Sequence, residues 1–137
     1  MRTLITIILL FFVTLTLTGC GSGNVPLSGK VILEDGTLLT HGIIVFDDGT
    51  HIARATIQPD GTFTAGYDKQ NNGLPKGQYR VYIIGTEEML PNPEEVYPPP
   101  MRPLMNPKYS KKETSGLAVN VDGSSKTFDI HVENAKP

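Results

Sequence analysis

Tryptophan is absent from this chain of 137 residues, and cysteine occurs only once. No disulfide can form within the chain, so a folded domain must be stabilised by its packed core alone. Basic residues are not in excess, because 12 Lys and Arg stand against 14 Asp and Glu, a formal net charge of −2. The one basic cluster, Lys108, Lys111 and Lys112, lies in a polar stretch typical of a solvated loop. A nucleic-acid partner requires a concentrated basic face, so the composition argues against one.

Motifs for catalysis and metal binding are also missing. No serine lies in a G-x-S-x-G elbow, there is no glycine-rich phosphate loop, and His41, His51 and His131 lack the spacing of a metal pair. The adjacent glutamates at 87–88 and 94–95 point apart in an extended chain, which makes them poor acid–base partners. The sequence predicts no enzyme, no cofactor and no metal site. The alternative that stays open is a surface site of His and Asp from neighbouring strands.

The N-terminus has the organisation of an export signal. Met1 and Arg2 supply a short positive region, and residues 4–17 form an uncharged apolar run. A membrane-spanning helix needs roughly 20 residues, whereas a run of this length is typical of a signal peptide. Small residues then precede the single cysteine, Cys20.

The residues around this cysteine match a lipobox: Leu17, Thr18, Gly19 and Cys20. The segment thereby resembles bacterial lipoproteins, in which the thiol takes a diacylglyceryl group. The resemblance implies a signal peptide over residues 1–19, cleavage after Gly19 and lipidation of Cys20. Two or three acyl chains, such as palmitate, on one residue are enough for stable membrane anchoring. Gly21, where a retention signal would be Asp, permits the outer membrane. The alternatives are a general secretory signal that contains a cysteine and an uncleaved anchor.

Seven short runs beyond the leader are rich in β-branched and aromatic residues. They occupy residues 27–33, 42–46, 51–57, 62–66, 77–85, 115–121 and 126–132. Apolar and polar residues alternate in several of them, as at Tyr79, Val81 and Ile83, so one strand face is predicted to lie in the core. No stretch shows a convincing helical period. We predict an all-β fold, an antiparallel β-sandwich of about seven strands over residues 27–133, preceded by a flexible tether over residues 20–26.

The triplet Asp-Gly-Thr occurs three times between these runs, at residues 35–37, 48–50 and 60–62. A calcium loop needs several oxygen ligands that converge from one short segment, and each triplet brings only one or two carboxylates. Asp-Gly between alternating apolar runs is typical of a hairpin turn, because glycine adopts positive φ freely. We therefore predict turns at these positions.

Several short motifs occur in a characteristic order. They are LSGKV at 27–31, DGTL at 35–38, VF at 45–46, DGTF at 60–63 and GQYRV at 77–81. In this order they resemble the carboxypeptidase regulatory-like domain, a transthyretin-like (prealbumin-type) sandwich. The tail over residues 106–132 is similar to the end of small bacterial lipoproteins built on that domain. The resemblance covers about residues 27–132 and implies an accessory or binding module without catalytic residues.

Residues 89–114 are predicted to form a long proline-rich loop, which holds most of the eleven prolines. A loop of this length without a strand pattern is usually functional or disordered. One interpretation is a recognition arm that presents Tyr97, Met101, Met105 and Tyr109 to a partner. The other is a crossover whose prolines and apolar residues cover one end or edge of the sandwich.

Together these observations predict a lipid-anchored module of the cell envelope, on the periplasmic or cell-surface side of a membrane. Its expected contacts are the membrane, through the N-terminal lipid, and envelope proteins, in a non-catalytic interaction or structural role. The alternative is a carbohydrate-binding module that recognises a polysaccharide. The absence of tryptophan speaks against that alternative, because exposed aromatic rings would have to stack on the sugars.

Overall fold

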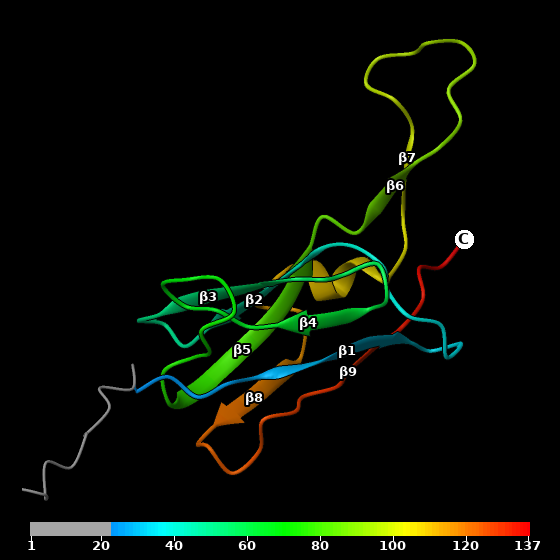
Figure 1. Cartoon of the computed structure of the whole chain (residues 1–137). Coiled ribbons are helices and arrows are strands. Elements are labelled where there is room, and N and C mark those ends of the chain that lie inside the picture. Colours follow the sequence, from blue (N-terminus) through cyan, green and yellow to red (C-terminus); the bar gives the residue numbers. More distant parts are fainter. Residues whose placement is uncertain (1–22) are drawn as a thin grey trace, which may run out of the picture.

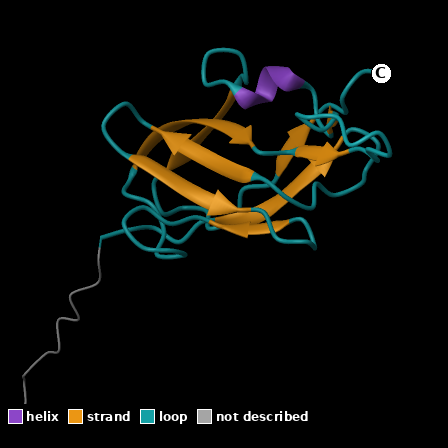
Figure 2. Ribbon diagram, turned by 90° about the horizontal axis from the view of Figure 1, so that it is seen from above, coloured by secondary structure: helices purple, strands orange, loops and turns teal. Residues whose placement is uncertain are grey.

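Alternating apolar residues build two packed sheets in the computed structural model, which describes residues 23–137 (Figure 1). The four-stranded sheet has the order β3-β2-β5-β8, and the three-stranded sheet has the order β4-β1-β9. The strands are β1 (Ser28–Leu33), β2 (Ile43–Asp47), β3 (Ile52–Thr56), β4 (Thr62–Thr64), β5 (Gly77–Ile84), β8 (Leu117–Val121) and β9 (Ile130–Val132). Each falls within or beside a predicted run, and the predicted β-sandwich is confirmed (Figure 2).

The core lies between the two sheets and follows the alternation of the sequence. On β5, Tyr79, Val81 and Ile83 are buried while Arg80 and Ile84 are exposed. The Tyr79 hydroxyl donates a hydrogen bond to the carbonyl oxygen of Pro75 at 2.9 Å, so its polar end is satisfied. Burial raises the pKa of Tyr79 to about 12 because the phenolate would lose solvation. Within residues 23–137 no helix is long and apolar enough to cross a membrane.

One strand pairing departs from the predicted antiparallel pattern. β1 pairs with β4 in antiparallel fashion but with β9 in parallel, so that Val31 lies beside Ile130 and Leu33 beside Val132. Parallel partners need a long connection, and here the whole of the chain between β1 and β9 supplies it. The three-stranded sheet is therefore mixed, whereas the four-stranded sheet is antiparallel throughout.

The tether predicted over residues 20–26 is shorter in the structure than expected. Val25 is buried in the core, and its amide nitrogen and carbonyl oxygen both bond to Leu74, at 2.7 and 2.9 Å. The prediction of a flexible tether was wrong at Val25, because this residue continues the apolar alternation of Leu27, which is buried too. The sandwich thus begins at Val25.

The three Asp-Gly-Thr triplets form turns, as predicted. The carboxylates of Asp35 and Asp60 each accept hydrogen bonds from the amide and hydroxyl of the threonine two residues later. Asp48 accepts bonds from the amides of Thr50 and His51. These bonds stabilise the ionised carboxylates and lower the pKa of all three aspartates, that of Asp48 to about 2.

The segment predicted as one proline-rich loop contains regular structure. Strands β6 (Glu87–Met89) and β7 (Met101–Pro103) pair as an antiparallel hairpin, and the 3₁₀ helix η1 (Pro107–Ser110) follows. Sequence patterns missed both strands because three residues are too few to show an alternation, and β7 ends on a proline. The prediction of one proline-rich loop without strands over residues 89–114 was therefore wrong where β6, β7 and η1 lie.

Candidate functional site

The β6–β7 hairpin projects from the body of the sandwich as an arm, which we define as residues 87–103 (Figure 1). Its stem is held by strand pairing that places Met89 opposite Met101. The amide of Leu90 adds a hydrogen bond to the carbonyl oxygen of Pro100 at 2.9 Å, which extends the stem by one residue. The arm leaves the sandwich at the end opposite to Gly23, where the described chain begins.

The tip of the arm is a turn closed by the side chain of Asn92. Its amide oxygen accepts a bond from the Val96 nitrogen at 3.1 Å, and its amide nitrogen donates to the Val96 oxygen at 2.8 Å. The backbone adds a bond from the Glu95 nitrogen to the Asn92 oxygen at 3.1 Å. Prolines 91, 98, 99 and 100 flank this turn and Pro93 lies within it, and each fixes its own φ angle. A turn of this kind loses little conformational entropy when a partner binds.

The arm exposes several large apolar side chains. Tyr97 is 93% exposed, and Met89, Val96 and Met101 are each more than half exposed. Large apolar groups that protrude together on a stable turn are typical of a binding surface, since aromatic residues and methionine are enriched at the cores of interfaces. Two of the candidate residues, Tyr97 and Met101, thus lie where a partner can reach them.

The other two candidate recognition residues do not lie on the arm. Met105 is 1% exposed and Tyr109 is 7% exposed, and both belong to the hydrophobic core. The backbone of this part closes one end of the sandwich: the Leu104 amide bonds the Thr86 oxygen, and the Asn106 amide bonds the Glu133 oxygen. The proline-rich segment therefore combines both interpretations, an arm up to Pro103 and a buried crossover after it. For Met105 and Tyr109 the recognition prediction was wrong. The backbone bonds of Leu104 and Asn106 hold Met105 against the sandwich, and Tyr109 is the buried residue of η1, which lies against β5.

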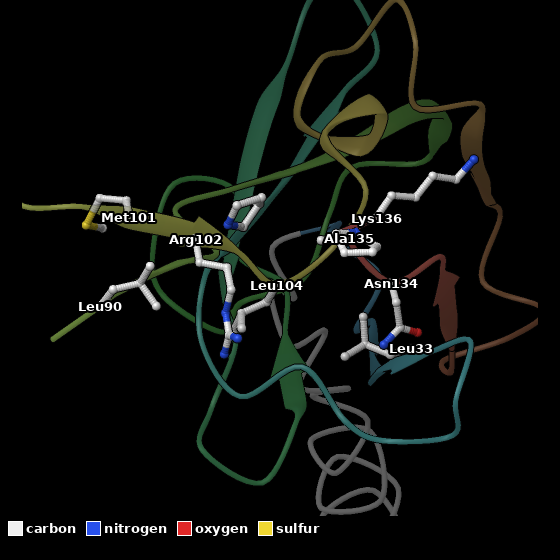
Figure 3. A pocket seen from close by; sticks show the side chains of 10 residues that line it. Leu33, Leu90, Met101, Arg102, Leu104, Asn134, Ala135 and Lys136 are labelled. Atoms are coloured by element: carbon white, nitrogen blue, oxygen red, sulfur yellow. The ribbon is translucent and has the colours of Figure 1, made fainter.

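An open groove of about 580 Å³ lies where the arm meets the sandwich (Figure 3). Leu90 and Met101 of the arm lie on one side, and Leu33 and Asn134 of the sandwich lie on the other. Arg102 also lines the groove and forms an ion pair with Glu88 on the opposite strand of the arm. The pair is exposed and adds little to stability. Because Arg102 is the single cation of the arm and Glu88 already balances it, the other carboxylates of the arm have no cation of the arm beside them.

The arm is strongly acidic. It carries Glu87, Glu88, Glu94 and Glu95 against the single cation Arg102, so its net charge is −3. The two glutamates of the tip, Glu94 and Glu95, are exposed and directly precede the apolar side chains of Val96 and Tyr97. A partner of the arm must therefore combine apolar surface with positive charge.

The three histidines are not brought together. His51 bonds Asp48 within one turn at 2.9 Å, His41 lies against the Glu87 carbonyl at the base of the arm, and His131 is exposed on β9. In the part of the chain that the structure describes, no group of three or more His, Cys, Asp and Glu could hold a metal ion. Cys20 and the lipobox residues Leu17, Thr18 and Gly19 lie outside the described residues.

A second exposed apolar surface was missed by sequence reasoning. Ile43, Ile52 and Ile84 lie on the outward face of the four-stranded sheet and are 37%, 53% and 38% exposed. The signal was present in the alternation itself, because Ile52 shares its phase with the exposed Arg54 and Thr56. An isoleucine in the polar phase of a half-buried strand marks an apolar surface that faces solvent.

Comparison of the chain with protein-family models, with curated proteins and with solved structures finds no match.

Proposed function

We propose that this protein is a lipid-anchored, non-catalytic module of the cell envelope that binds a protein partner through its arm. The observation that supports the proposal best is the arm itself. It projects from the sandwich, its tip is closed by Asn92, and Tyr97 at the tip is 93% exposed. An isolated ring so far from the core adds nothing to folding, so a binding role explains its position best.

The position of the proposed anchor agrees with this function. Val25 is fixed in the core, and four residues lie between it and Cys20, which limits the distance between the two to about 18 Å. A lipid on Cys20 would hold one end of the sandwich close to the membrane, and the arm leaves from the opposite end (Figure 1). The arm would thus stay free of the lipid surface and accessible to other envelope proteins.

The proposal includes the resemblance to the carboxypeptidase regulatory-like domain. The motifs that carry it lie on β1, β2, β4 and β5 and in the turns between them, and they contribute Val31, Phe46, Phe63 and Tyr79 to the core. A polysaccharide partner is the alternative. The arm offers only one tyrosine for stacking on a sugar, so a protein partner fits its apolar and acidic surface better.

The anchor is tested by labelling cells with an alkyne analogue of palmitate and measuring the mass of the purified protein. We expect labelled protein that lacks residues 1–19 and carries acyl chains at its N-terminus. The variant Cys20→Ser should stay unlabelled and uncleaved. Labelling of this variant, or unlabelled wild-type protein, would reject the lipoprotein part of the proposal.

The arm is tested by placing a photo-crosslinking phenylalanine analogue at position 97 and irradiating whole cells. The matched control places the same analogue at His131, which is exposed on β9. A second variant replaces residues 91–99 by Asn-Gly, a two-residue hairpin turn that keeps the bond between Leu90 and Pro100. We expect a protein adduct at position 97 alone, and we expect the shortened arm to release the partner. Capture of glycan would favour the alternative, and no capture at position 97 would reject the recognition arm.

A further inference from the structure

The outward face of the four-stranded sheet combines apolar and basic side chains. We define the outer sheet face as Ile43, Ile52, Arg54, Arg80, Tyr82 and Ile84, which come from three neighbouring strands. The strand register sets them in rows. Ile43 of β2 lies next to Ile84 of β5, so two exposed isoleucines form one apolar patch at the end of the sheet that leads into the arm.

The basic groups of this face lie in the next two rows. Val45 of β2 has Arg54 on one side and Tyr82 on the other, while Asp47 lies between Ile52 and Arg80. The Asp47 carboxylate is bonded to the Lys112 ammonium at 2.7 Å, which lowers the pKa of Asp47 and keeps its charge balanced. Within residues 23–137 neither Arg54 nor Arg80 takes part in an ion pair. The face is therefore positive, although the whole chain carries a net charge of −2.

The arm has the opposite character. Its net charge is −3, and its one cation, Arg102, already pairs with Glu88. Glu94 and Glu95 therefore stand beside the exposed Val96 and Tyr97 without a cation of the arm to balance them. The arm and the outer sheet face are thus complementary in two respects. The acidic residues of the arm suit the basic residues of the face, and the ring of Tyr97 can cover its exposed isoleucines.

From this complementarity we propose that the arm of one copy docks on the outer sheet face of a second copy. The inference rests on the proposed function of the arm as a recognition element and names its partner. Tyr97 packs on the apolar patch of Ile43 and Ile84, and Glu94 and Glu95 pair with Arg54 and Arg80. An arm that projects away from its own sandwich makes this contact with a neighbour rather than with itself (Figure 1).

This contact joins two different surfaces, so it does not close as a two-fold dimer does. Each copy in a docked pair still has a free arm or a free outer sheet face, and further copies can add head to tail. Ile43 and Ile84 lie at the end of the sheet from which the arm departs. Anchoring in one plane also raises the effective concentration of the partners.

The experiment uses the full-length protein in cells, with two differently tagged copies that each carry one new cysteine. The pair Val96→Cys and Thr56→Cys keeps Tyr97 and both isoleucines, and Thr56 lies next to Ile43 in the strand register. This pair should form a disulfide-linked heterodimer under mild oxidation. The matched control pairs Val96→Cys with His131→Cys, which is exposed on β9 of the other sheet. We expect at least a tenfold lower yield for the control. Equal yields for the two pairs would reject docking on the outer sheet face.

Charge reversal is the second test of the proposed contact. Arg54→Glu with Arg80→Glu, in the copy that carries Thr56→Cys, should reduce the heterodimer about tenfold. Glu94→Arg with Glu95→Arg in the other copy should restore it. These four side chains are exposed, so the fold should tolerate the changes. If the yield of heterodimer stays the same after both charge reversals, the proposal is overturned.

Photo-crosslinking at position 97 separates the failure of this inference from the failure of the proposed function. Capture of a second copy supports both. Capture of a different protein would leave the recognition arm intact and reject self-association. If nothing is captured at position 97, both proposals are rejected.

Discussion

The side chain of Asn92 bonds both backbone polar groups of Val96, with distances of 3.1 Å to the nitrogen and 2.8 Å from the amide nitrogen to the oxygen. A single asparagine thus replaces the pair of backbone bonds that would close a turn between two strands. Within the turn, Glu95 has a φ of 52°, a conformation that residues other than glycine rarely adopt. The two side-chain bonds hold the tip in this shape.

Replacing Asn92 by alanine should loosen the tip without affecting the sandwich. We expect the melting temperature to stay within about 2 °C of wild type, because the tip makes no contact with the core and surface changes cost little. Hydrogen exchange at the Val96 amide should become faster, and photo-crosslinking at position 97 should weaken. The control Asn92→Asp keeps the acceptor for the Val96 amide and should protect it. Unchanged exchange in the alanine variant would show that the prolines alone hold the turn.

Replacement by alanine should strongly destabilise the protein at Met105 and have little effect on its stability at Met101. Met105→Ala leaves a cavity in the core and should lower the free energy of unfolding by about 2–5 kcal/mol. Met101→Ala removes a side chain that is half exposed and should change it by less than about 0.5 kcal/mol. Urea unfolding followed by circular dichroism measures both. Similar losses for the two variants would contradict the division of the proline-rich segment into an arm and a buried crossover.

Gly29 should be essential for the parallel pairing of β1 with β9. A Cβ atom at this position would lie 2.0 Å from the carbonyl oxygen of Phe128, a backbone atom that can move only if the strands separate. We expect Gly29→Ala to destabilise the protein by about 1–3 kcal/mol, a size typical of steric overlap.

The matched control for this substitution is Gly77→Ala at the start of β5. The nearest atom to its Cβ would be Asp48 Oδ2 at 3.4 Å, an ordinary contact. Thermal unfolding of the two variants should therefore differ clearly. Equal melting temperatures would show that the gap between β1 and the Phe128 backbone widens at little cost.

The Asp48 turn should make stability fall in acid. Backbone and side-chain bonds from His51 hold the pKa of Asp48 at about 2, below the ordinary value of 3.8. The ionised carboxylate therefore stabilises the fold above pH 3.8, and this contribution is lost as the pH falls towards 2. Asp48→Asn should be less stable than wild type at pH 6, and the difference in melting temperature should shrink between pH 3.8 and pH 2. A difference that is constant with pH would assign the effect to geometry rather than charge.

Much of the sandwich could be predicted from the sequence because its signals are local. Tyr79, Val81 and Ile83 alternate along one strand, and that period alone requires them to share a buried face. The aspartates of the Asp-Gly-Thr turns bond threonines two residues away, so the chemistry of each turn is complete within three residues. Tyr97 and Met101 were candidates for recognition because prolines surround them, and both are exposed.

The sequence by itself therefore determined the seven strands of the sandwich, their turns and their buried faces, since each of these depends on residues that are neighbours in the chain. Only the tertiary structure decided that Met101 is exposed and Met105 buried, although both follow a proline-rich stretch four residues apart. That outcome depends on Thr86 and Glu133, which receive the backbone bonds of the crossover from distant parts of the chain. The parallel pairing of β1 with β9 likewise joins residues 99 positions apart, as in the bond from Lys30 to Asp129. Contacts across such separations form only when the whole core packs, so no local pattern records them.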